Sequence, residues 1–123
     1  MVSATRPVLV VEDDGLIRMD LIDVLVDAGF EVLEAANADE ALLVLERQDG
    51  VMALLTDIDM PGSMNGVGLA KVSAERWPQC RIVVISGRYS PEHGSLPAGA
   101  RFLSKPILEG ALHRMLNELD IRP

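Results

Sequence analysis

Five short apolar runs recur along the chain, and longer stretches with helical periodicity separate most of them. The first, third and fourth runs lie at Val8–Val11, Met52–Thr56 and Ile82–Ile85, and each is almost continuously apolar. Such runs are typical of strands that are covered on both faces, whereas half-buried strands alternate. Two weaker runs, Val32–Ala35 and Arg101–Leu103, complete a prediction of five strands.

Apolar residues repeat at helical spacing in four other segments, which predicts four amphipathic helices. The first helix should end at Gly29, because glycine is typical of the position that follows a helix C-terminus. Asn37 and Glu40 resemble a capping box at the start of the second, and Pro78 should stop the third. The four stripes run over Ile17–Ala28, Ala41–Leu45, Leu69–Trp77 and Leu108–Leu119.

The stretch from Gly87 to Ala100 differs from these segments. It contains three glycines and two prolines, which are poor helix formers. We predict that it is mostly loop, with one helical turn at best.

Strands that alternate with helices predict an α/β fold built on a parallel sheet with right-handed crossovers. No linker, repeat or low-complexity tract divides the 123 residues, so we expect a single domain over residues 1–123. In such sheets ligands bind outside the carboxyl ends of the strands. The residues that follow the strands are therefore the first candidates for a site.

The composition excludes several classes of function. A net charge of −8 argues against nucleic-acid binding, which depends on Lys and Arg neutralising phosphates. No apolar run approaches the ~18 residues of a membrane span, and the N-terminal run is too short for a signal peptide. The single cysteine offers neither an internal disulfide nor a metal cluster. We expect a cytoplasmic protein whose acidic surface suits a protein partner or a cation.

Polar side chains follow four of the predicted strands, and the sheet should bring them to one edge. They are Glu12 and Asp13, Asp57, Ser86 with Gly87, and Lys105. Two carboxylates ~4 Å apart repel by about 4 kcal/mol at an effective dielectric of about 20, so positive charge must compensate. Lys105 is one of two lysines in the chain, and an all-oxygen ligand set suits Mg²⁺. Asp57 would then be able to attack a phosphorus atom, with Lys105, the metal and the Ser86 hydroxyl stabilising the phosphoryl oxygens.

Four stretches together resemble the receiver domain of bacterial two-component response regulators. They are VLVVEDD, LLTDIDMPGSMNG, IVVISG and FLSKP, in this order and each at a strand end. The resemblance extends from about Pro7 to Leu119. It implies a flavodoxin-like five-stranded parallel sheet of order 2-1-3-4-5 flanked by helices, with the fourth helix shortened or irregular in this chain.

The resemblance also implies roles for individual residues. Asp57 is expected to be the phosphoacceptor, with Mg²⁺ bound by Asp13 and Asp57, by Glu12 through water and by the Asp59 backbone carbonyl.

Phosphoryl contacts are expected from Ser86, Gly87 and Lys105, and a cis bond before Pro106 is favoured. Ser86 and Phe102 are the expected switch pair. Asp59 and Arg88 are expected to tune dephosphorylation. Asp14 is the better candidate for capping the first helix.

Resemblance to a receiver implies that the protein is a signalling regulator and does not act as an enzyme on an external substrate. We expect phosphoryl transfer from a histidine kinase or histidine phosphotransfer protein, followed by control of a downstream protein or use as a phosphate sink in a phosphorelay. No DNA-binding or enzymatic output domain is expected. Two alternatives remain: a small aspartyl-phosphate phosphatase of the haloacid-dehalogenase type, which the D-x-D of Asp57 and Asp59 resembles, and a receiver-like scaffold regulated without phosphorylation.

Overall fold

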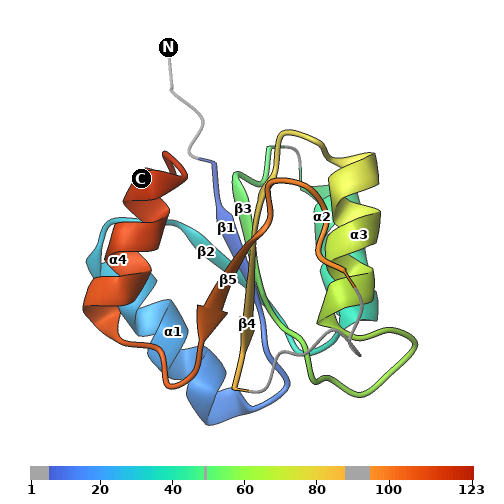
Figure 1. The fold of residues 1–123 in the computed structure, drawn as a ribbon, viewed down its shortest axis with the longest axis horizontal. Coiled ribbons are helices and arrows are strands. Elements are labelled where there is room, and N and C mark those ends of the chain that lie inside the picture. Colours follow the sequence, from blue (N-terminus) through green and yellow to red (C-terminus); the bar gives the residue numbers. More distant parts are fainter. Residues whose placement is uncertain (1–5, 49, 88–94) are drawn as a thin grey trace.

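The structure, a computed structural model, describes residues 6–48, 50–87 and 95–123. Its centre is a parallel sheet of five strands in the order β2-β1-β3-β4-β5 (Figure 1). The strands are β1 (Val8–Val11), β2 (Val32–Ala35), β3 (Ala53–Asp57), β4 (Arg81–Ser86) and β5 (Arg101–Ser104). This confirms the expected fold class and strand order, and the strand bounds differ from the predicted ones by one residue at most.

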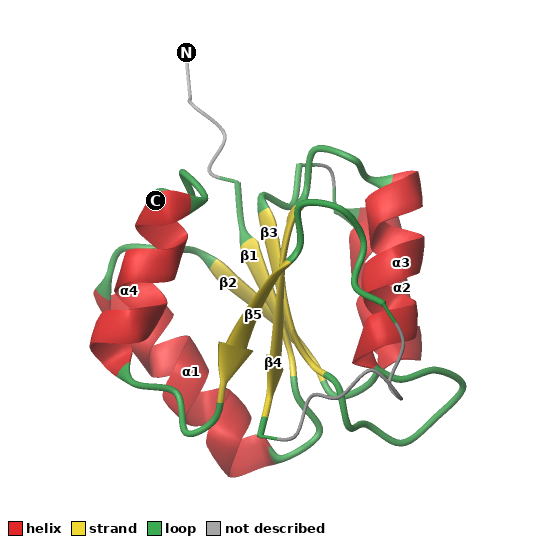
Figure 2. Cartoon of the chain, viewed as in Figure 1, coloured by secondary structure: helices red, strands yellow, loops and turns green. Residues whose placement is uncertain are grey.

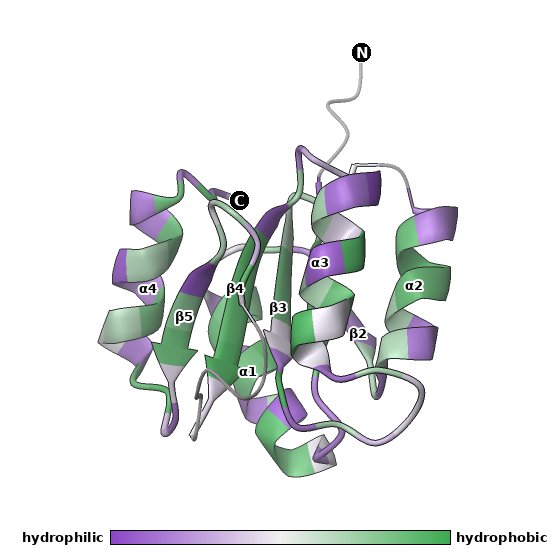
Figure 3. Cartoon of the chain, turned by 45° about the vertical axis from the view of Figure 1, so that its right-hand side comes forward, coloured by the Kyte–Doolittle hydropathy of each residue, from purple (hydrophilic) through white to green (hydrophobic). Residues whose placement is uncertain are grey.

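Helices cover both faces of the sheet in the described part of the chain. One face carries α1 and α4, and the other carries α2 and α3 (Figures 1 and 2). The helices are α1 (Gly15–Asp27), α2 (Ala38–Arg47), α3 (Gly66–Arg76) and α4 (Glu109–Glu118). Leu25 of α1, Leu45 of α2 and Leu112 of α4 are buried in the core, whereas α1 also exposes Leu16, Met19 and Val26. Figure 3 colours the helices and strands by hydropathy, and apolar residues occur along both.

Alternation along the central strands divides the core into two layers. Val8 and Val10 of β1 pack in the cluster under α1 and α4, while Leu9 and Val11 pack in the cluster under α2 and α3. All four side chains are buried. A strand covered on both faces has no position that faces solvent, which explains the nearly continuous apolar runs of the sequence.

Side-chain caps determine where three helices begin. The Asp14 carboxylate accepts hydrogen bonds from the backbone N–H groups of Leu16 and Ile17 at the start of α1. Asn37 and Asn65 cap α2 and α3 in the same way, through the N–H groups three residues ahead. Gly29 follows α1 with a φ of +96°, a conformation that glycine adopts without strain. The predicted caps at Asp14 and Asn37 are confirmed.

The segment predicted to replace a regular fourth helix lies only partly within the described residues. Residues 88–94 are outside them, and residues 95–100 form loop and turn. Leu96 and Ala100 pack against Val84 of β4 and the adjoining side of α3. In the described ranges no helix has the length and hydropathy that a bilayer-spanning segment requires.

Candidate functional site

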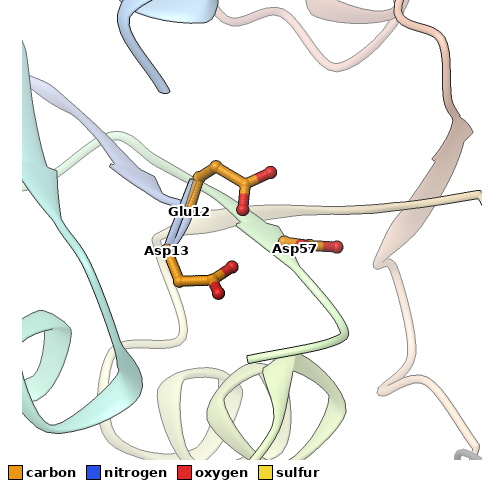
Figure 4. A group of neighbouring side chains, drawn as sticks. All are labelled: Glu12, Asp13 and Asp57. Carbon is orange, nitrogen blue, oxygen red and sulfur yellow. The ribbon is translucent and has the colours of Figure 1, made fainter. Parts of the chain in front are cut away.

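Three carboxylates meet at the carboxyl edge of the sheet. Glu12 and Asp13 directly follow β1, and Asp57 is the last residue of the neighbouring strand β3. One oxygen from each lies within 4.8 Å of the other two, and their side chains project to the same side of the strand ends (Figure 4). Glu12 and Asp57 are buried, whereas Asp13 is exposed.

The sheet register explains this meeting. Val11 of β1 pairs with Thr56 of β3, so the next residues, Glu12 and Asp57, lie opposite each other. Parallel strands end at the same edge, and each additional carboxylate there adds repulsion. At 4.8 Å a pair of ionised carboxylates repels by about 3.5 kcal/mol at an effective dielectric of about 20.

The ammonium of Lys105 supplies positive charge to this cluster. Its Nζ lies 2.8 Å from Glu12 Oε1 and 3.2 Å from Asp57 Oδ2. Burial lowers the pKa of Lys105, but the hydrogen bond to Glu12 and the charge of Asp57 outweigh it, and the pKa lies above its ordinary value of 10.5. Lys105 is therefore charged at neutral pH, beside the carboxylates of Glu12 and Asp57. The Lys105–Pro106 peptide bond is cis, as expected.

The Asp13 carboxyl lies in an environment that disfavours its ionised form. Loss of solvation raises the pKa of the Asp13 carboxyl, and the hydrogen bond and charge of Glu12 raise it further. A divalent cation would reverse this effect, because it favours the ionised carboxylate. Three carboxylate oxygens on one open side fit Mg²⁺, which binds a few carboxylates and keeps several waters.

Ser86 and Gly87 complete the same edge. Ser86 is the last residue of β4, is fully buried, and accepts a hydrogen bond at its carbonyl from the Lys105 N–H (3.0 Å). A Cβ on Gly87 would lie 3.9 Å from the Lys105 Cβ. The predicted phosphoryl-binding residues are thus adjacent to Lys105.

The remaining predicted residues lie further out or outside the described residues. Phe102 lies on β5, pairs in register with Val84 and is partly buried. Asp59 lies two residues beyond β3 and is exposed, and its side chain is not in the carboxylate group. Arg88 lies outside the described residues. The metal role of the Asp59 carbonyl and the switching and tuning roles stay predictions.

Comparison with known proteins identifies the family of the chain. The model of the response regulator receiver domain matches residues 8–117. The chain belongs to this family. Receiver protein CpdR of Brucella abortus is 33% identical over 119 residues, which cover 94% of each chain. A solved CheY-like receiver of Methanospirillum hungatei superposes with a TM-score of 0.84 at 30% identity, covering 95% of each chain.

Other relatives of this receiver are much longer proteins. Sensor kinase CckA of Brucella abortus is 34% identical over an alignment 126 positions long, which covers 96% of this chain but 13% of CckA. An NtrX-like response regulator of Rickettsia bellii is 37% identical over 90 residues, which are 72% of this chain and 18% of that protein. Receivers of this type therefore occur within larger proteins as well as over nearly whole chains.

Two residues that support the receiver site were not predicted. Gly66, the first residue of α3, donates a backbone hydrogen bond to Ile58 O (2.9 Å). A Cβ on Gly66 would lie 1.9 Å from the Asp57 carbonyl oxygen. Arg18 of α1 donates to the Glu12 carbonyl oxygen. Neither role follows from a pattern in the sequence, because each depends on how the loop after a strand brings the following helix back against the end of that strand.

Substitution of Gly66 by Ala should destabilise the receiver by about 2 kcal/mol or more, since the main chain of Asp57 must move. Gly110→Ala is the matched control, because a Cβ there meets nothing within 4 Å and alanine is the better helix former. Urea denaturation of both variants measures the difference. Equal stability of the two would show that α3 has room to retreat from Asp57.

Substitution of Lys105 by Met should lower the free energy of unfolding by about 2 kcal/mol at neutral pH. Because the folded pKa of Lys105 is raised, its stabilisation is complete below its ordinary pKa of 10.5 and is lost as the pH rises through the folded value. The gap between wild type and variant should therefore be constant at neutral pH and narrow only as the pH rises above about 10.5. Lys71→Met, which removes an exposed lysine of α3, is the control. A gap independent of pH would contradict the ion-pair explanation.

Proposed function

We propose that this receiver accepts a phosphoryl group on Asp57 and acts as a phosphorylation-switched regulator in two-component signalling. The observation that carries the proposal is the position of the Asp57 carboxylate, 3.2 Å from Lys105 Nζ and grouped with Glu12 and Asp13. Family membership supports the same function.

The chemistry follows from the charges at the sheet edge. A carboxylate oxygen of Asp57 attacks the phosphorus of the donor, the P–N bond to the donor imidazole breaks, and its electron pair returns to the ring. Lys105, the Ser86 hydroxyl and the Gly87 N–H would bind the phosphoryl oxygens. Mg²⁺, when bound, supplies further positive charge against the phosphoryl oxygens.

The ligands proposed for Mg²⁺ are the carboxylates of Asp13 and Asp57, the Asp59 carbonyl oxygen, and Glu12 through a water. Before phosphorylation Lys105 is shared by Glu12 and Asp57. The arriving phosphoryl group competes for this ammonium and for the Ser86 hydroxyl. We propose that Ser86 then moves toward Asp57 and that Phe102 follows it, which changes the surface near β4 and β5. Asp59 and Arg88 would tune the rate of dephosphorylation.

The proposed donor is a histidine kinase or a histidine phosphotransfer protein. The match with CckA, whose name is that of a sensor kinase, supports a kinase as the source. The phosphorylated receiver would then control a downstream protein or pass its phosphoryl group on.

Incubation with acetyl phosphate and Mg²⁺ tests the proposal by intact-mass spectrometry. We expect the wild type to gain one phosphoryl group, about 80 Da, and Asp57→Asn to gain none. Asp23→Asn, which changes an exposed aspartate of α1, should behave as wild type. Chelation of Mg²⁺ should abolish the adduct.

Equal labelling of the wild type and Asp57→Asn would show that a residue other than Asp57 accepts the phosphoryl group. Absence of any adduct on the wild type would favour a receiver-like scaffold regulated without phosphorylation.

A further inference from the structure

Arg18 joins three elements beside the carboxylate cluster. It lies near the start of α1, and its Nη1 donates to the Glu12 carbonyl oxygen at 2.7 Å. Its Nε donates to Glu34 Oε1, on the edge strand β2, at 2.9 Å. The guanidinium therefore bridges the end of β1 to β2 across the first turn of α1.

With this contact, every polar atom of Glu12 has a partner. Its N–H donates to the Ala35 carbonyl at 3.1 Å, and Oε1 accepts from Lys105. Oε2 accepts from the Asp14 N–H at 3.2 Å. Arg18 supplies the remaining partner, at the carbonyl oxygen. Charge-assisted hydrogen bonds of this length are the strong ones.

The Glu12 carbonyl also controls the direction of Asp13. This carbonyl belongs to the planar peptide unit that leads into Asp13, so holding its oxygen fixes the plane from which the Asp13 side chain departs. Asp13 is exposed, and packing contributes little to its position. The main chain must therefore place its carboxylate.

We propose that Arg18 is a positioning residue of the metal site. By bridging the Glu12 carbonyl to Glu34, it holds the Glu12–Asp13 peptide at the angle at which both carboxylates meet Asp57. The planar fork of arginine suits this role, because it presents donors in two directions at once, which a lysine ammonium on a flexible stem does not. The inference rests on the proposed function in that Mg²⁺ is the ligand.

The ion pair between Arg18 and Glu34 contributes little to the stability of the fold by itself. The Glu34 side chain is 58% exposed, and exposed pairs contribute little to stability. Its effect is to orient the guanidinium so that Nη1 points at the Glu12 carbonyl. Removal of Arg18 should accordingly affect Mg²⁺ binding more than folding.

The test is calorimetric titration of Mg²⁺ into each variant, without any phosphodonor. Arg18→Ala should raise the Mg²⁺ dissociation constant roughly tenfold, as loss of groups that orient metal ligands commonly does. Arg18→Lys, which restores one donor, should fall between the alanine variant and wild type. Arg76→Ala is the matched control, because it removes a similar guanidinium–carboxylate pair (3.0 Å to Glu46) remote from the site.

A second readout uses protein without Mg²⁺. The NMR amide signals of Asp13 and Asp14 should shift in Arg18→Ala and stay in place in Arg76→Ala. Mg²⁺ affinity of Arg18→Ala within twofold of the control, or unchanged amide signals, would overturn the proposal. If Arg18→Ala does not fold, Arg18→Lys decides by the same two measurements.

Failure of the proposed function is distinguishable from failure of this inference. A wild type that binds Mg²⁺ yet takes no phosphoryl group would contradict the function and leave the role of Arg18 intact. Normal phosphorylation of Arg18→Ala with the same Mg²⁺ requirement would support the proposed function and contradict the role of Arg18.

Discussion

Repulsion among three carboxylates at one edge of the sheet is the constraint on which the site depends. Glu12 and Asp57 are buried, so water cannot screen their charges as it would on the surface. A buried charge is tolerated only when it is paired and hydrogen-bonded. Lys105 contacts both carboxylates, and its raised pKa records their attraction. Loss of solvation raises the pKa of the Asp13 carboxyl, and the hydrogen bond and negative charge of Glu12 raise it further. Under the proposed function, a divalent cation would relieve the repulsion among the carboxylates, and Lys105 and that cation would neutralise the oxygens of an incoming phosphoryl group.

The fold maintains this unfavourable grouping by making the strand ends rigid. Two apolar layers hold β1 and β3 from both sides, and the register between them places Glu12 opposite Asp57. α3 approaches so closely at Gly66 that only a glycine fits beside the Asp57 carbonyl. The stability of the core thus compensates for the electrostatic cost of the site.

The strands and most of the site were predictable from the sequence, for physical reasons that can be named. Val8–Val11 is apolar throughout because both of its faces are buried, and this pattern needs no knowledge of the partner strands. Asp57, Ser86 and Lys105 were predicted as neighbours because parallel strands end at one edge. Arg18 and Gly66 were not predicted, because their roles come from contacts with Glu12 and Asp57 that no local pattern encodes. The contact of the Lys105 ammonium with both Glu12 and Asp57 was likewise not predicted, because it depends on where the side chain lies in the folded structure.

The most direct test of the central claim is the Mg²⁺ affinity of Lys105→Met beside that of Lys71→Met. If the repulsion among the three carboxylates is only partly offset by Lys105, removal of its ammonium increases that repulsion and should raise the affinity of the site for a cation. The account predicts that Lys105→Met binds Mg²⁺ at least about fivefold more tightly than wild type, while Lys71→Met does not. Unchanged or weaker binding by Lys105→Met would contradict it.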